Sequence, residues 1–231
     1  MTSPVAAFSF DEPSGDVQDY SGNGHHFTLN NNLVRAVDGH TSGGLTRDGG
    51  AGTMGVVASV PFIAESNWTI MFWQRNPGNA VWWLRLFNND ENSGHGILNT
   101  GVLTARVRQP GGVNRIVTTS PPAQDNVWRH YCMTFDGTFG RLYINANLIG
   151  TTPAVTTPVP IHRIDVAEHT LTNFTMDDLR FFNLEQSQPQ IQTWMNTPVA
   201  ADTGAATRWR NGAGTPLTPR LLTGSGLIDL S

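Results

Sequence analysis

The sequence predicts an all-β protein folded as an antiparallel sandwich of two sheets, and three observations point to this class. Short apolar or alternating stretches rich in Val, Ile, Phe and Trp recur roughly every 10 to 15 residues. Turn-forming residues separate these stretches, drawn from 24 Gly, 14 Pro and many Asn and Asp. Only one segment has helical spacing. At 231 residues the chain suits one large domain of this class.

The predicted strands follow one another along the chain with turns between them. In order, the candidates are residues 5–10, 26–29, 55–60, 68–75, 81–87, 96–98, 102–108, 115–119, 128–135, 141–149, 161–166 and 174–182. One short helix is predicted at residues 185–195, because Ile191, Trp194 and Met195 recur at helical spacing and Pro189 is tolerated in a first turn.

Residues 127–152 are the most informative segment, because they predict three strands joined by two tight turns. Odd and even positions along residues 128–135 fall on opposite faces of a strand. Asp136 and Gly137 then open a turn. A second turn is predicted at residues 145–147, where asparagine tolerates a positive φ. We therefore expect an antiparallel meander here.

Composition excludes several classes of function. Charged residues make up 14% of the chain and hydrophobic residues 39%, which is typical of a folded, weakly charged protein. The net charge is −4 and there is no basic run, so nucleic acid is not an expected partner. No apolar run reaches the length of a membrane span.

All 14 basic residues are Arg, and Lys is absent. Protein physics does not require this, whereas GC-rich coding favours Arg codons, so we expect a high-GC organism or a virus of one. Cys132 is the only cysteine, which rules out an intramolecular disulfide, and its place in an alternating strand predicts a buried, inert thiol. The first ten residues, MTSPVAAFSF, do not have the pattern of a signal peptide, so synthesis in a host cytoplasm is expected.

The amino-acid composition of the sequence changes near residue 196. We expect one domain over residues 1–196 and an extended Gly-, Pro- and Thr-rich tail over residues 197–231. The tail is predicted to contact a neighbouring copy or another protein through isolated apolar anchors, and the alternative is a linker wrapped on its own domain. The anchors are Trp209, Leu221, Leu222, Leu227 and Ile228.

Four segments, in this order, resemble the laminin G-like, concanavalin A-like lectin family. They are AFSFDEPSGDVQDYSGNGHHFTLNN, NWTIMFWQR, the meander that begins at Trp128, and FTMDDLRFFNLEQSQPQI. The resemblance covers roughly residues 5–195, and it departs from the family where Asn145-Ala146-Asn147 replaces an Asp-Gly turn. It implies a jelly-roll sandwich with one short C-terminal helix. Many members of the family bind carbohydrate, whereas others are adhesion or structural modules, and the fold does not decide between these roles.

The acidic loop at residues 11–26 is a candidate structural calcium site. Ca²⁺ takes six to eight oxygens, and a Gly-rich turn offers carbonyls beside carboxylates. The candidate ligands are Asp11, Asp19 and Asn23, and the resemblance adds Asp177 from the closing strand. An EF-hand does not fit, because Asn30 stands where a bidentate Glu is needed. The alternative is an Asx-type turn held by side-chain to backbone hydrogen bonds.

Strand 81–87 and the polar loop after it are the candidate glycan-binding site. Alternation places Trp83 and Arg85 on one face, where an aromatic ring can stack on a sugar and a guanidinium can bind hydroxyls. The candidate residues are Trp83, Arg85, Asn89, Asp90 and Asn92. The alternative is that the aromatics pack in a core and the loop is a solvated turn. The four tryptophans assigned to the core are Trp68, Trp73, Trp128 and Trp194.

Catalysis is not expected. Glycosidases need two neighbouring carboxylates, and the five Glu residues are widely separated with no E-x-D-x-x-E run. No catalytic motif for hydrolysis or phosphate binding is present.

These patterns give one leading hypothesis and one alternative. The leading hypothesis is a non-catalytic recognition module on the surface of a bacteriophage particle, as a minor tail or decoration protein, that binds host-envelope polysaccharide. The alternative is a purely structural decoration protein, anchored through its C-terminal tail to other virion proteins or to its own copies.

Overall fold

The computed structural model describes the chain in segments, and it separates into two units. The described residues are 2–29, 33–36, 38–47, 56–57, 66–75, 82–87, 94–99, 102–110, 114–120, 125–158, 163–166, 175–199, 220–223 and 226–229. The first unit is Met1–Val199 and the second is Ala200–Ser231.

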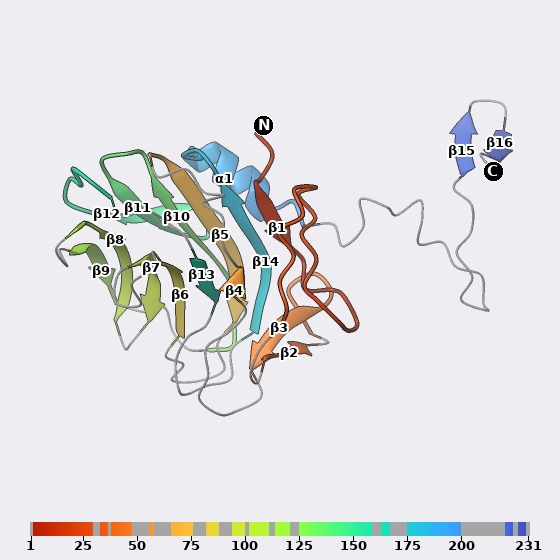
Figure 1. The fold of residues 1–231 in the computed structure, drawn as a ribbon, viewed down its shortest axis with the longest axis horizontal. Helices are drawn as coiled ribbons and strands as arrows, with labels where there is room; N and C mark the ends of the chain where they lie inside the picture. Colours follow the sequence, from red (N-terminus) through yellow and green to blue (C-terminus); the bar gives the residue numbers. More distant parts are fainter. Residues whose placement is uncertain are drawn as a thin grey trace. The chain divides into compact units, whose positions relative to one another are not determined.

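One sheet of the first unit has eight strands in the order β12-β11-β10-β5-β14-β3-β2, with β1 also paired to β14 (Figure 1). Their bounds are β1 Ala6–Phe8, β2 Leu33–Ala36, β3 Gly44–Arg47, β5 Trp68–Arg75, β10 Arg129–Phe135, β11 Gly140–Ile144, β12 Asn147–Thr151 and β14 Thr175–Phe182. Every pairing within this sheet is antiparallel. The meander expected at residues 127–152 is therefore present as β10, β11 and β12.

The second sheet has six strands in the order β4-β13-β6-β7-β8-β9, again antiparallel throughout. Their bounds are β4 Val56–Val57, β6 Trp82–Phe87, β7 Gly94–Asn99, β8 Leu103–Arg108, β9 Asn114–Thr119 and β13 Arg163–Val166.

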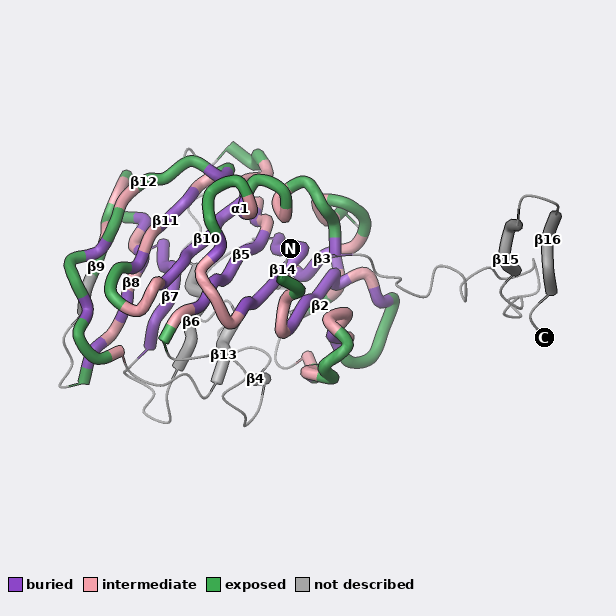
Figure 2. Tube along the Cα trace, turned by 90° about the horizontal axis from the view of Figure 1, so that it is seen from above, coloured by how far each residue is buried: buried purple, intermediate pink, exposed green. Residues whose placement is uncertain are grey.

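The two sheets enclose one main core. It combines Trp68, Phe72 and Phe135 of the eight-stranded sheet with Ile97 and Val107 of the six-stranded sheet, all fully buried. Figure 2 shows buried residues running along β5, β10 and β14 and exposed ones in β9 and β12. Inner positions alternate with outer ones along β8, as a half-buried strand requires. The predicted jelly-roll sandwich with one short helix is confirmed.

Strand β14 is the centre of the larger sheet, and all eight of its residues are buried. One edge pairs with β5, and the other edge pairs first with β3 and then with β1. The register shifts between Asp177 and Arg180, and Asp178 has a φ of 52°. This bulge lies where β14 changes partner from β3 to β1.

Helix α1 (Gln188–Met195) covers part of the outer face of the larger sheet, where Ile191 packs with Met71 and Phe182 in a second apolar cluster. Gln190 Oε1 accepts the backbone N–H of Ser187 at 2.8 Å, and this bond caps the N-terminus of the helix. The predicted helix is therefore present but starts three residues later than expected.

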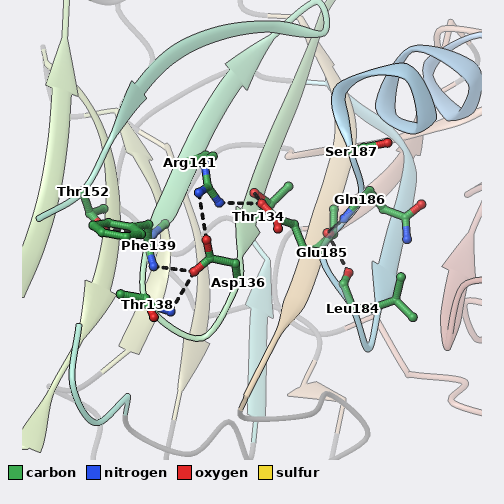
Figure 3. Close-up of polar contacts among 12 residues, drawn as sticks. Thr134, Asp136, Thr138, Phe139, Arg141, Thr152, Leu184, Glu185, Gln186 and Ser187 are labelled. Carbon is green, nitrogen blue, oxygen red and sulfur yellow. Dashed lines mark hydrogen bonds and ion pairs between the residues drawn. The ribbon is translucent and has the colours of Figure 1, made fainter. Parts of the chain in front are cut away.

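A polar network ties the loop before the helix to the meander (Figure 3). Arg141 contacts Glu185 at 2.5 Å and Asp136 at 2.8 Å, and Thr134 Oγ1 donates to Glu185 at 3.3 Å. Asp136 Oδ1 also accepts two backbone N–H groups of its own turn, each at 2.7 Å. The predicted Asp136-Gly137 turn is thus held by its own side chain.

Several elements differ from the sequence-based expectation. Strands β2 and β3 were not expected, because the segment around them is polar and short of apolar alternation. Residues 26–29 do not form a strand, and only Phe27 makes an isolated bridge, to Val17. In the C-terminal segment, the structure describes a hairpin of β15 (Arg220–Thr223) and β16 (Gly226–Asp229).

No helix in the described part of the chain is long and apolar enough to cross a membrane.

The close contact between Gly150 of β12 and Val117 of β9 gives a stability prediction. A Cβ at Gly150 would lie 2.3 Å from Val117 Cγ2, so Gly150→Ala forces a stiff β-branched side chain to move. We expect a loss of about 1–3 kcal/mol in the free energy of unfolding, measured by urea denaturation. In a Val117→Ala background the same substitution is expected to cost clearly less, and equal costs in the two backgrounds would contradict the close contact.

Candidate functional site

The carboxylate of Asp19 organises the acidic opening loop. Its Oδ1 accepts the backbone N–H of Ala7 and of Ser21, each at 2.9 Å. Its Oδ2 accepts the Ser21 hydroxyl at 2.8 Å and the backbone N–H of His25 at 2.9 Å. Asp19 is 7% exposed; its bond with Ala7 is buried, and the other three bonds are partly buried. The sequence pattern Asp-Tyr-Ser-Gly-Asn-Gly therefore builds an Asx-type turn tied to β1.

The other predicted metal ligands face different partners. Asn23 donates from Nδ2 to the Val5 carbonyl at 2.9 Å, beside Asp19. Asp11 Oδ1 accepts the N–H of Gly43 at 2.6 Å. Asp177 lies in the β14 bulge and accepts from the same turn, residues 38–43. The structure thus brings Asp11 close to Asp177, and Asp19 close to Asn23, as two separate pairs.

This geometry favours the turn interpretation over a calcium site. The carboxylate oxygens point at backbone N–H donors, whereas a calcium ion needs six to eight oxygens turned to one point. Among the described residues, no group of three or more His, Cys, Asp and Glu is placed to hold a metal ion. Calcium binding stays a prediction, to be tested below.

Asp177 and Asp178 are both buried, and each accepts backbone N–H groups. Asp177 Oδ2 accepts from His40 at 2.7 Å and from Thr41 at 3.0 Å, and Asp178 Oδ1 accepts from Val199 at 2.7 Å. Burial, and after it the charge of Asp178, raise the pKa of Asp177 to about 7. Burial likewise raises the pKa of Asp178 to about 6. Both groups hold structure together and are not open to a substrate.

Register places two of the five predicted glycan-binding residues, Trp83 and Arg85, on the outer face of the six-stranded sheet. Ile97 is buried in the core, so its neighbour Gly96 belongs to the outer set. Arg85 pairs with Gly96, and Gly96 pairs with Arg106, so the two arginine positions flank a glycine that has no side chain. Trp83 shares the face of Arg85. The loop residues Asn89, Asp90 and Asn92 lie outside the described residues.

Positive charge predominates on this outer face. At its described strand positions, the charged residues are Arg85, Arg106, Arg108, Arg163 and Asp165. Arg106 reaches over β7 and donates from Nε to the Gly94 carbonyl at 2.9 Å. The excess of arginine contrasts with the net charge of −4 of the whole chain. We call this face the arginine row.

The predicted assembly residues lie in the second unit. Trp209 falls outside the described residues. The other four stand in the β15–β16 hairpin, where Leu221 pairs with Ile228 and Leu222 pairs with Leu227.

A group of aromatic residues on the outer face of the larger sheet was not found by sequence reasoning. Trp73 and Trp128, which the sequence placed in the core, are half-buried on this face, whereas Trp68 is fully buried as expected. His40 stacks on Trp73 with ring centroids 3.7 Å apart and planes at 13°. His130 meets Trp73 edge-on at 5.4 Å. The available signal was the alternation that sets Trp73 and His130 opposite the core positions.

The sequence matches the family described as the concanavalin A-like lectin/glucanases superfamily (Laminin_G_3) over residues 48–192. This span is more than half of the chain, and it agrees with the two-sheet fold. The chain belongs to this family. A comparison with curated proteins found no match.

Solved structures similar to this laminin G-like chain include toxin binding domains. The binding domain of Paraclostridial Mosquitocidal Protein 1 is 20% identical with a TM-score of 0.65, over 94% of this chain and 56% of that one. The receptor binding domain of botulinum neurotoxin type G is 15% identical with a TM-score of 0.65, over 94% and 55%. The serotype D binding domain is 12% identical with a TM-score of 0.67, over 93% and 55%. The chain spans about half the length of these structures, and at such identities the likeness shows the fold alone.

The role of Asp19 in this laminin G-like domain is testable by substitution. Asp19→Ala removes the acceptor of four hydrogen bonds, and we expect it to lower the free energy of unfolding by about 2–4 kcal/mol. Asn23→Ala, in the same loop but exposed, is the matched control and is expected to cost under about 1 kcal/mol. The melting temperature is then compared in Ca²⁺ and in EDTA. A rise with Ca²⁺ that Asp19→Ala abolishes would restore the calcium interpretation.

The burial of His130 predicts a pH effect. Burial lowers the pKa of His130 to about 3, from 6.5 when it is exposed. Between these values the unfolded chain binds more protons, so stability falls as the pH drops. Asp177 and Asp178, whose pKa values are raised, act in the opposite sense between about pH 4 and 7. Wild type is expected to lose up to about 1.4 kcal/mol more per pH unit than His130→Leu below pH 6.5. Parallel stability curves of the two proteins, from urea denaturation at pH 7, 6 and 5, would count against this burial.

Proposed function

We propose that this chain is a non-catalytic recognition module that binds an acidic glycan of a bacterial envelope through the arginine row. The supporting observation is the register Arg85–Gly96–Arg106. Arginine binds carboxylate and phosphate groups through two parallel hydrogen bonds. Trp83 stands at a register position on the same face, where an indole ring would serve for stacking. Family membership and the likeness to toxin binding domains are consistent with a binding role.

A non-catalytic role is supported by the use made of the described carboxylates. Glycoside hydrolysis needs two carboxylates that face the scissile bond. Asp177 and Asp178 are instead buried and accept backbone N–H groups. Glu185 is bound to Arg141, and Glu12 to Arg35. Each of these four groups has a structural partner.

We place the module on the exposed surface of a bacteriophage particle, as a minor tail or decoration protein. The absence of Lys among 14 basic residues supports a phage of a high-GC host, and a glycan-binding module suits adhesion to that host. Host-surface polysaccharide and other virion proteins would then be its partners.

A second candidate function is structural attachment to the particle without glycan binding. It is favoured by the separate second unit, residues 200–231, and by its hairpin of paired leucines. A two-stranded hairpin is marginally stable alone, so contacts with another protein would stabilise it.

The arginine row is tested by binding of the full chain to acidic polysaccharides, uronic acid-rich and phosphate-rich, by isothermal titration calorimetry. We expect saturable binding that weakens as salt rises from about 50 to 300 mM, because exposed charges are screened. Arg106→Ala is expected to weaken it by roughly tenfold.

Arg129→Ala is the matched control, since it removes the same charge from the opposite sheet and its partner Asp125 is exposed. It is expected to leave acidic polysaccharide binding within about twofold of wild type. Binding that Arg106→Ala leaves unchanged, or no binding to any acidic polysaccharide, would overturn the arginine row and leave attachment as the better function.

A further inference from the structure

The outer face of the larger sheet carries a second cluster, which we call the tryptophan platform: His40, Trp73, Arg75 and Trp128, with His130 beneath. Trp73 and Arg75 come from β5, Trp128 precedes β10, and His40 comes from the turn at residues 38–43. Register sets His130 opposite Trp73. Trp73, Trp128 and His40 are each half-buried, so the cluster has a buried side and a surface side.

The His40 ring lies between two tryptophans, parallel to Trp73 and edge-on to Trp128. His40 lies parallel to Trp73 at 3.7 Å and meets Trp128 edge-on at 5.6 Å, with an interplanar angle of 71°. The Arg75 guanidinium lies 5.1 Å from the centre of the Trp128 ring. Half-buried indole rings held in this way lose little freedom on binding, which favours stacking of a ligand ring on Trp128.

Each cation at the platform is balanced by a carboxylate. Arg75 forms an ion pair with Asp38, whose side chain is 63% exposed. Burial lowers the pKa of His40, so its imidazole is neutral at neutral pH. The platform therefore favours a ligand without net charge.

Four ring nitrogens of the platform have no hydrogen-bond partner among the described residues. They are Nδ1 of His40, Nε1 of Trp73, and both Nδ1 and Nε2 of His130. His130 is fully buried. Buried polar atoms in folded proteins nearly always find a partner, so four of them in one cluster indicate a hydrogen-bonding occupant. Because these nitrogens are buried, water molecules would bridge them to a ligand at the surface, and hydroxyl groups both donate to and accept from such water.

From these observations we infer that the tryptophan platform binds a neutral saccharide, with a pyranose ring stacked on Trp128 and its hydroxyls bonded around His40 and the Asp38–Arg75 pair. The site shares its class of ligand with the proposed function but uses none of the residues of the arginine row. One domain thus offers an acidic-glycan face on one sheet and a neutral-sugar face on the other.

Asp177 is the positioning residue of this site. Its carboxylate accepts the backbone N–H of both His40 and Thr41, and this holds the turn that carries His40 onto Trp73. Asp11 supports the same turn from the other side through Gly43. The β14 bulge therefore sets the platform geometry without touching the ligand.

The experiment uses the full chain and a panel of neutral gluco-, galacto- and manno-hexasaccharides. Binding is measured by calorimetry, and the tryptophan indole N–H signals are followed by NMR. We expect saturable binding of at least one neutral saccharide, with shifts of the Trp73 and Trp128 signals and none of the buried Trp68 signal. Trp128→Ala is expected to weaken binding by roughly tenfold or more, while Trp128→Phe, which keeps a ring, retains part of it.

Phe139→Ala is the matched control, because Phe139 is another partly exposed aromatic residue, 36% exposed, away from the platform. It is expected to leave binding unchanged. No neutral saccharide binding, or binding that neither depends on Trp128 nor shifts its signal, would overturn the inference. If the chain binds acidic polysaccharide, loses this binding in Arg106→Ala and binds no neutral saccharide, the platform inference alone would be overturned. Neutral binding at Trp128 without Arg106-dependent acidic binding would overturn the arginine row alone.

Discussion

The domain depends on one constraint in its central strand: β14 has to change partner from β3 to β1 along a single edge. Between the two pairings, the bulge at Asp177 and Asp178 frees both side chains to accept backbone N–H groups from elsewhere. One carboxylate thereby holds the turn at residues 38–43, and the other holds Val199 at the end of the domain. Two buried carboxylates would be costly if unpaired, and here the backbone donors offset part of that cost.

The same bulge connects stability with the surface of the larger sheet. The turn held by Asp177 carries His40, which stacks on Trp73, and Trp73 covers the buried His130. Burial shifts the pKa values of the carboxylates and of the imidazole in opposite directions. Their effects on the free energy of unfolding therefore oppose each other between about pH 4 and 7. Acidification in this range thus destabilises the fold through His130 and stabilises it through the two carboxylates.

The two outer faces of the sandwich differ in chemistry because only the inner faces are needed for the core. Alternation buries Ile97 and Val107 inward on one sheet and leaves Gly96, Arg106 and Arg108 on its outer face. The larger sheet instead presents aromatic rings with balanced charges. A fold of this family is compatible with many ligands, so the chemistry of each face, not the fold, carries the functional argument.

The sequence by itself determined the strands with strong local alternation, such as β5 and the meander, the Asp136-Gly137 turn, the helix after Ser187, and the common face of Trp83 and Arg85. These depend on periodicity and turn chemistry within a few residues. Tertiary structure decided the rest. Strands β2 and β3 lack a local apolar pattern; β3 forms because β14 offers it an edge, and β2 then pairs with β3. Asp19 became the centre of a turn because its loop closes on β1, and the platform exists because the register of β5 and β10 and the Asp177 bulge bring together side chains far apart in the chain.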